Sequence, residues 1–322
     1  MTYTTTMTFE FDHFVDRCVQ LALRSNDLAE YQARYLGVER NLFPPPPQGN
    51  LRDDDSLRRR LGLAMARAVW HASPLPALNF VCPRAASLER NSVCYCGSGV
   101  KYKQCCEMLA RDVPLRNVNL LPQILAYVPR TVWKKLPASR VEIDRIAHTA
   151  QQWLQGGDEK SALALLEPWL AEDDSFVARR ELLFDLLLNL YFDLNKPRKK
   201  AQLLDRAVRF GDKTLRSGAL QRLASMASDK GDYARAWDLF NQARQIDPDA
   251  VSLSHLEVTM LISEGREEES RHCAALWIQR LSRLRDPELR PLIDVLRQLQ
   301  QGGAEALDRL NESLSLDRSF GS

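Results

Sequence analysis

Four cysteines crowded into thirteen residues constrain this chain more than any other feature of its sequence. Of its seven cysteines, those in the cluster are Cys94, Cys96, Cys105 and Cys106. Because Cys94 and Cys96 flank a single residue, the backbone must turn sharply to aim both sulfurs at one point. Gly97 and Gly99 follow at once, and glycine reaches the backbone angles that a tight turn needs. We expect residues 100–107 to begin a helix that brings the second pair of cysteines back over the first.

This pattern is typical of a structural zinc site, in which four Cys or His side chains surround the ion at Zn–S distances of about 2.3 Å. Four thiolates around Zn²⁺ leave a net negative charge, which Arg90, Lys101 and Lys103 could offset while lowering the thiol pKa values. Four Cys ligands leave no open coordination position, so we expect a structural rather than a catalytic ion. Iron is an alternative metal, since thiolates bind both. Four buried or disulfide-bonded cysteines are the metal-free alternative.

The run Cys-x-Cys-Gly-Ser-Gly-x-Lys-Tyr-Lys-x-Cys-Cys at residues 94–106 resembles the SEC-C motif. That motif is a small zinc-binding module at the C-terminus of the bacterial preprotein translocase ATPase, and it recurs in many other bacterial proteins. The resemblance implies that Cys94, Cys96, Cys105 and Cys106 are the ligands, and that the module serves protein or ribosome contact rather than catalysis. The motif often has proline before its first cysteine, where this chain has Val93.

The composition is that of an ordinary globular protein. The chain has 322 residues, 45% apolar and 27% charged, and its net charge of +2 gives no strong case for nucleic acid or membrane as the main partner. The first residues lack a basic region followed by an apolar run, and the longest apolar stretch is too short to cross a bilayer. With free-thiol chemistry at the cluster, we expect a cytoplasmic protein without membrane insertion.

Residues 1–80 are expected to form an N-terminal helical region. Apolar residues recur at spacings of three and four through residues 9–36, which predicts one amphipathic helix with Cys18 packed in the core. His13 lies near Cys18, but a metal pair would need two further ligands that the sequence does not place nearby. Phe43-Pro44-Pro45-Pro46-Pro47 predicts a stiff extended connector, with docking in an aromatic groove as the alternative.

A second helix is predicted from Ser56 to His71. Asp53-Asp54-Asp55 precedes it, and negative residues suit a helix start, although three acids together leave a Mg²⁺ site as an alternative. The helix is basic on one side because of Arg58-Arg59-Arg60, with Arg52 and Arg67 nearby. A solvated face is the default interpretation, and contact with RNA or an acidic partner is the alternative. The apolar side is formed by Leu57, Leu61, Ala64, Met65 and Ala68.

The fold class predicted for the whole chain is all-α. Residues 81–112 hold the cysteine cluster, with Cys82 as a packed or surface thiol, and residues 113–140 are expected to be a helical linker punctuated by prolines. Residues 141–322 show a helical pattern with a period near 34 to 37 residues that resembles tetratricopeptide repeats. The best unit is Ser217–Ala250, turning at Gly231. Further turns are expected at Gly156-Gly157, Asn195-Lys196-Pro197, Gly265 and Gly302-Gly303, and ordinary helical packing is the alternative.

Motifs of common enzymes are absent from the sequence. It has no phosphate-binding loop, no dinucleotide-binding loop, no nucleophile elbow and no His-Glu-x-x-His, and its five histidines are scattered. We therefore expect a non-enzymatic adaptor that binds a protein or peptide partner through the repeats and the zinc module. The ribosome, the secretion machinery and chaperone clients are the partner classes considered. The module would offer its loop residues Tyr95, Ser98, Val100 and Lys103 as contacts. The alternative is a nucleic-acid or ribonucleoprotein binder that uses the basic helix.

Overall fold

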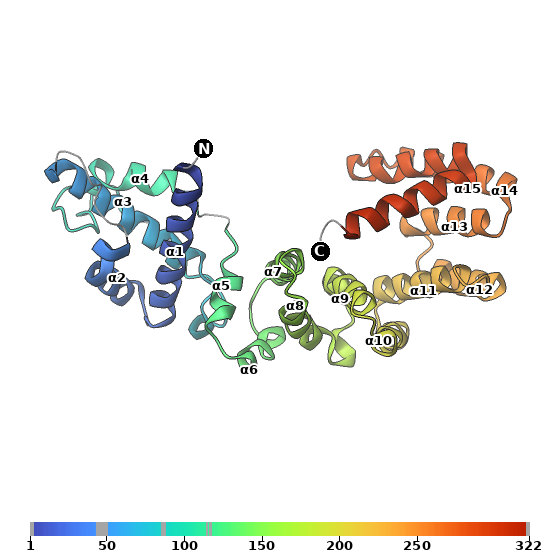
Figure 1. Cartoon of the computed structure of the whole chain (residues 1–322), viewed down its shortest axis with the longest axis horizontal. Helices are drawn as coiled ribbons and strands as arrows, with labels where there is room; N and C mark the ends of the chain where they lie inside the picture. The colour runs from blue at the N-terminus through green and yellow to red at the C-terminus, as the bar shows by residue number, and fades with distance from the viewer. Residues whose placement is uncertain (1–2, 43–50, 85–87, 114, 116–117, 320–322) are drawn as a thin grey trace. The chain divides into compact units, whose positions relative to one another are not determined.

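The computed structural model describes residues 3–42, 51–84, 88–113, 115 and 118–319, and among these it contains fifteen α-helices and no β-strand (Figure 1). The prediction of an all-α protein is confirmed. The polyproline segment 43–47 and the side chains of Asp53 and Asp54 lie outside the described part. The chain divides into two compact units, residues 1–149 and 150–322, with the division inside one helix. Within the described residues, no helix is long and apolar enough to cross a membrane.

Unit 1 is built mainly on three helices, to which shorter ones are added. These are α1 (Tyr3–Leu23), α2 (Leu28–Leu42), α3 (Leu51–Ala72), α4 (Glu107–Asp112), α5 (Leu121–Ala126) and α6 (Arg130–Trp133), with 3₁₀ turns at Pro76–Leu78, Tyr102–Gln104 and Leu136–Ala138. Helix α7 (Ile143–Gln155) leads from this unit into the next.

The core of unit 1 is aromatic. Phe14 of α1 meets Tyr35 of α2 edge to face at 6.1 Å, and Tyr31 lies 5.0 Å from Trp70 of α3. The Tyr31 hydroxyl donates to the backbone carbonyl of Ala66 at 2.8 Å, so this buried polar group is paired. Cys18 is fully buried in the same region, which confirms its predicted place in the core.

The single helix expected over residues 9–36 is wrong, because the chain breaks between α1 and α2. Asp27 causes the break: its carboxylate accepts the backbone N–H of Glu30 at 2.8 Å, which is the geometry of a helix N-cap. The Asn26 backbone N–H donates to the Glu30 carboxylate at 2.8 Å, which completes a reciprocal cap. The apolar stripe continues across the break, and periodicity alone does not reveal such a cap.

The predicted orientation of α3 is wrong at its start, although Ala64 of the predicted apolar side is buried. Leu57, assigned to the apolar side, is 46% exposed, whereas Arg58, assigned to the solvated side, is 6% exposed. Arg58 pairs with Asp55 at 2.8 Å, and Glu39 of α2 lies 3.9 Å from it. The face that packs into the core is instead formed by Leu63, Ala66, Val69 and Trp70.

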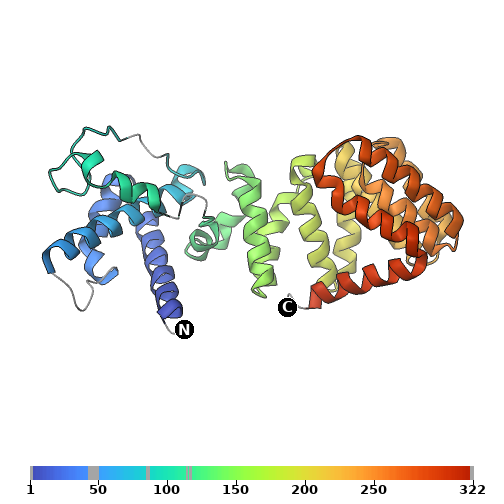
Figure 2. The same cartoon turned by 90° about the horizontal axis from the view of Figure 1, so that it is seen from above.

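Unit 2 consists of consecutive α-helices joined by short turns. They are α8 (Glu159–Leu166), α9 (Glu181–Asp193), α10 (Pro197–Phe210), α11 (Lys213–Ser228), α12 (Tyr233–Ile246), α13 (Ser252–Ser263), α14 (Glu267–Arg283) and α15 (Arg290–Ser319). Four 3₁₀ turns accompany them at Glu167–Leu170, Asp173–Ser175, Ala178–Arg180 and Pro287–Leu289. Helix α11 packs against α12, α13 against α14, and α14 against α15, and the kinked α15 is seen in red in Figure 2.

The hairpin of α11 and α12 is the best-formed pair, as the sequence predicts. Gly231 turns the chain with φ = 74°, and Asp232 caps α12 by accepting the Arg235 N–H at 3.3 Å. Ala224 and Ala236 are fully buried, so the two helices can approach closely, and Phe240 is buried between them and their neighbours.

The other predicted turns are also present. Gly157 and Gly265 adopt φ = 75° and 79°, Asn195 adopts φ = 50° just before α10, and Gly303 interrupts α15 with φ = 50°. These angles lie in the left-handed region that favours glycine. Regular helical hairpins are therefore a property of unit 2, and their assignment to the tetratricopeptide class stays a prediction.

Candidate metal centre

Cys94 and Cys96 lie on a short loop that is closed by backbone hydrogen bonds. Val93 and Lys101 form an isolated antiparallel bridge, and the Cys94 N–H donates to the Val100 carbonyl at 2.8 Å. Between them, Gly97 and Gly99 adopt φ = 78° and 73°, and no heavy atom lies within 4 Å of where a Cβ would stand on either. Backbone conformation rather than space therefore accounts for glycine at both positions.

Cys105 and Cys106 do not lie on a continuous helix, so the helix predicted over residues 100–107 is wrong. Residues 102–104 form one 3₁₀ turn, and Cys105 leaves it with φ = −123° and ψ = −87°, which is not helical. Cys106 then stands at the N-cap of α4, where its carbonyl accepts the Ala110 N–H at 2.9 Å. A continuous helix would turn adjacent side chains about 100° apart, whereas this break lets the sulfurs of both cysteines reach one point.

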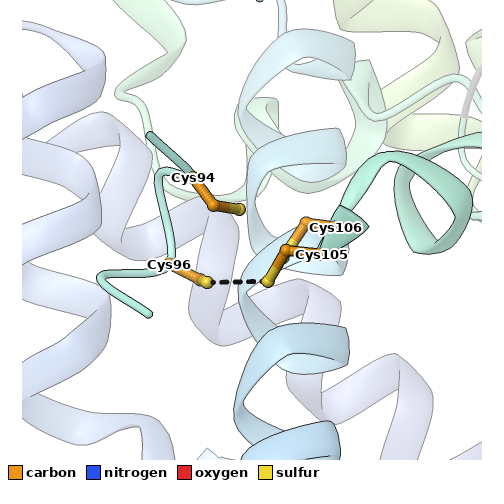
Figure 3. A group of neighbouring side chains, drawn as sticks. All are labelled: Cys94, Cys96, Cys105 and Cys106. Atoms are coloured by element: carbon orange, nitrogen blue, oxygen red, sulfur yellow. Dashed lines mark hydrogen bonds between the residues drawn. The ribbon is translucent and has the colours of Figure 1, made fainter. Parts of the chain in front are cut away.

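The four sulfurs converge (Figure 3). The Cys96 and Cys105 sulfurs are 3.4 Å apart, those of Cys105 and Cys106 are 3.8 Å apart, and all four lie within 4.8 Å of one another. A tetrahedron with metal–sulfur bonds of about 2.3 Å has sulfurs about 3.8 Å apart. None of the four is in a disulfide, so the spacing matches what one tetrahedral ion needs.

Burial divides the cluster into two halves. Cys94 and Cys106 are buried, and burial raises the pKa of each thiol. Cys105 is partly exposed, and although burial acts to raise the pKa of its thiol, hydrogen bonds from Ser98, Cys96 and Arg60 outweigh it and lower that pKa to about 7. The thiolate is the form that binds metal, so the lowered pKa prepares Cys105 for an incoming cation.

The positive charge at the cluster comes from a residue that the sequence analysis did not assign to it. The Arg60 guanidinium of α3 donates to the Cys105 sulfur at 3.9 Å. Arg90, which was expected to offset the thiolate charge, instead pairs with Glu107 at 3.0 Å, and Arg111 pairs with the same carboxylate at 2.8 Å. Helix α3 packs against α4, which explains how a residue 45 positions before Cys105 reaches it.

The remaining candidate residues stay away from the cluster. Cys82 donates to the Ala72 carbonyl at 3.4 Å, and His13 is exposed on α1. Among the described residues, the four clustered cysteines are the single group of three or more His, Cys, Asp or Glu side chains placed to share an ion.

The arrangement could hold one metal ion with four thiol ligands. Four soft sulfur donors in tetrahedral spacing suit Zn²⁺ or iron, and they fill the coordination shell of either. Residues 90–107 match the family model of the SEC-C motif, so the chain carries that motif over this segment, as the resemblance indicated. No curated protein and no solved structure matches the chain.

Proposed function

We propose that this protein is a cytoplasmic, non-enzymatic adaptor in which a zinc-loaded SEC-C module and the helical hairpins of unit 2 each contact a protein or peptide partner. Four thiol ligands support a structural role for the ion, because they leave it no position for a substrate or water. Zinc is favoured over iron because the SEC-C motif is a zinc-binding module, whereas the tetrahedral sulfur spacing suits either ion. The ribosome, the secretion machinery and chaperone clients are the partner classes suggested by that resemblance.

The observation that carries the binding role is a groove between α12, α13 and α14, with a volume of about 820 Å³. Trp237 and Trp277 line it, and their indole N–H groups donate to Glu264 and Glu257, each at 2.8 Å. These bonds fix the two rings, and the Arg266 and Arg280 guanidinium groups lie 5.5 Å and 4.9 Å from the ring centres of Trp237 and Trp277. The groove wall is therefore an ordered set of Trp and Arg side chains, which lose little side-chain entropy on binding. Leu276 adds an apolar side chain that is 54% exposed. Rigid aromatic residues beside an exposed aliphatic one are typical of protein-binding surfaces.

The alternative of nucleic-acid binding loses its main support in the structure. Arg58 is buried against Asp55, Arg59 pairs with Glu39 at 3.4 Å, and Arg60 contacts Cys105. Arginines that hold a protein together have little charge left for phosphates, so the adaptor is the better proposal.

Affinity purification from the native cell, followed by mass spectrometry, tests the proposal. We expect Leu276→Asp to remove partners that the wild type retains, because it places a charge in the groove. Leu284→Asp is the matched control, since Leu284 is 59% exposed at the C-cap of α14 but does not line the groove. Cys94→Ser tests the module separately. Identical partner lists for the wild type, Leu276→Asp and Cys94→Ser would contradict the adaptor role.

A further inference from the structure

Helix α14 presents one row of exposed side chains to the groove between α12, α13 and α14. Glu268, His272 and Leu276 follow one another at intervals of four residues, so they lie on one face of the helix. All three side chains are exposed, and Leu276 is the large apolar one among them. A rise of about 1.5 Å per residue places Glu268 and Leu276 about 12 Å apart along the helix axis. The row therefore offers an acid at one end and an apolar contact at the other.

Two of the three arginines that line the groove are held by carboxylates of the protein itself. Arg266 contacts Glu264 at 3.0 Å and Glu269 at 2.6 Å. Arg280 contacts Asp249 at 2.6 Å. Glu264 and Asp249 do not themselves line the groove. Both guanidinium charges are therefore balanced from within the chain, which leaves them little attraction for an anionic ligand.

The third arginine, Arg244, also faces an acid. Its guanidinium donates to the Asn241 side-chain oxygen at 2.9 Å and lies 3.8 Å from the Glu257 carboxylate. Glu257 in turn accepts the indole N–H of Trp277 at 2.8 Å. Each arginine of the groove is thus placed against at least one carboxylate.

Glu268 differs from the acids beside it at the start of α14. Glu267 pairs with Arg271 at 3.0 Å, and Glu269 is taken up by Arg266. Acids suit the first turn of any helix, so their number alone indicates no ligand. Within the described part of the chain, however, no Lys, Arg or His forms an ion pair with Glu268, which lines the groove. Its carboxylate is therefore available to a partner.

The charge of the groove as a whole is negative. The lining residues and the carboxylates that pair with them comprise three arginines and five acids, the acids being Asp249, Glu257, Glu264, Glu268 and Glu269. Complementary charge steers a partner to a surface and excludes partners of the same sign. The groove therefore favours a cationic segment over an acidic one.

The geometry points to a binding site for a cationic peptide, in which Lys or Arg pairs with Glu268 and an aliphatic side chain packs on Leu276. An extended chain advances about 3.3 Å per residue and turns every second side chain to the same face. Two anchors about 12 Å apart therefore correspond to peptide positions separated by four residues. This inference rests on the proposed adaptor function and names the chemistry of the partner segment that unit 2 contacts.

Calorimetric titration of the full-length, zinc-loaded protein with four hexapeptides at low salt tests the site. The reference peptide is acetyl-Arg-Ser-Ser-Ser-Leu-Ser-amide, and the others replace its arginine with glutamine, its arginine with glutamate, or its leucine with serine. We expect the glutamine peptide to bind about threefold more weakly, which is the range for one exposed ion pair. The serine peptide should bind about tenfold more weakly, because it loses the apolar contact. The glutamate peptide should be the weakest of the three charge variants.

A matched pair of protein variants assigns the preference to Glu268. Glu268→Gln is expected to bind the arginine and glutamine peptides equally, while its affinity for the glutamine peptide stays that of the wild type. Glu288→Gln is the control, because Glu288 is an exposed acid in the turn before α15 and does not line the groove. It should keep the full preference for arginine. Because both side chains are exposed, neither change removes a core contact.

Four results would overturn the inference: no binding of the reference peptide at millimolar concentration, equal binding of the arginine and glutamine peptides, tighter binding of the glutamate peptide, or an unchanged preference in Glu268→Gln. Partners lost with Leu276→Asp, without any preference among the peptides, would leave the adaptor function standing while this inference fails. A clear preference for the reference peptide, with identical cellular partners for the wild type and Leu276→Asp, would instead leave the peptide site standing and remove the groove from the adaptor role.

Discussion

At the scale of single residues, Arg60 is the side chain whose role differs most from what its sequence context suggests. It belongs to a run of three arginines, and such a run is usually interpreted as a solvated or nucleic-acid-binding face. Its guanidinium instead reaches Cys105, whose thiol pKa is lowered to about 7. A ligand's hydrogen-bond partner commonly tunes metal affinity as much as it orients the ligand.

We expect Arg60→Met to weaken Zn²⁺ binding by about tenfold, because removal of such an outer partner typically costs about 10–100-fold in affinity and this contact is long. Competition against a chromogenic chelator measures the change. Arg59→Met is the control, since Arg59 pairs with Glu39 rather than with a sulfur. Equal affinities for the two variants would show that Arg60 does not act on the ion.

His255 predicts a pH dependence for unit 2. It is half-buried on α13, and burial lowers its pKa from the ordinary value of 6.5. The unfolded chain therefore binds a proton at a higher pH than the folded chain does, and the stability present above pH 6.5 falls as the pH drops below it. Urea unfolding between pH 7.5 and pH 5.5 should show this loss, and His255→Leu should reduce it. An unchanged slope in that variant, or an equal reduction in His272→Leu on α14, would contradict the assignment.

The residue-level prediction from sequence succeeds where chemistry is local and fails where it depends on packing. Four cysteines within thirteen residues can meet without help from the rest of the chain, so their clustering could be predicted. Arg60 and Arg67 could not be assigned, because the face that α3 turns toward the cysteine loop is decided by its packing against α2 and α4. Their spacing of seven residues, which places both on one helix face, was the available signal.

At the scale of elements, the hairpin of α11 and α12 depends on close approach of two small-residue stripes. Phe240 → Ala should destabilise unit 2 by about 3–5 kcal/mol, the usual cost of emptying a fully buried phenylalanine site. Chemical denaturation followed by circular dichroism measures it. Phe210→Ala is the matched control, because Phe210 is 49% exposed at the end of α10 and should change stability by less than about 1 kcal/mol. Similar losses in both variants would mean that burial does not set the cost.

The element boundaries show why turns were easier to predict than caps. The glycines at 157, 231 and 265 adopt positive φ angles that few other residues tolerate, so each turn is encoded at one position. The break at Asp27 depends instead on a side-chain hydrogen bond within a continuous apolar stripe. The prediction of a helix over residues 100–107 was wrong for a related reason. The backbone of Cys105 leaves the helical region, which lets its sulfur reach the other three.

At the scale of the whole molecule, the two units should respond differently to metal removal. The SEC-C segment has few buried apolar residues, so we expect metal binding to supply much of its folding free energy. Unit 2 holds its own apolar core, which includes Phe240, Leu253, Val258 and Leu296. The finer division predicted from the sequence, into residues 1–80, 81–112, 113–140 and 141–322, stays a prediction.

Hydrogen exchange measured by mass spectrometry, with and without a chelator, should separate the units. We expect amides of residues 90–112 and of α3 to lose protection when the metal is removed, and amides of α11 to α14 to keep it. Metal replacement by added Zn²⁺ should restore the first set. Loss of protection across both units would contradict a local role for the ion.

Tyr95 occupies the one position between Cys94 and Cys96, and its ring lies against Arg67 at the wall of a cavity that α3 and α4 also line. Any ion that fixes the two flanking sulfurs also fixes this ring. Shortage of zinc, or oxidation of the thiols, would free the Tyr95 ring and change the shape of the neighbouring cavity. Recognition of a partner by unit 1 would then follow the cell's supply of the ion, without any separate sensor.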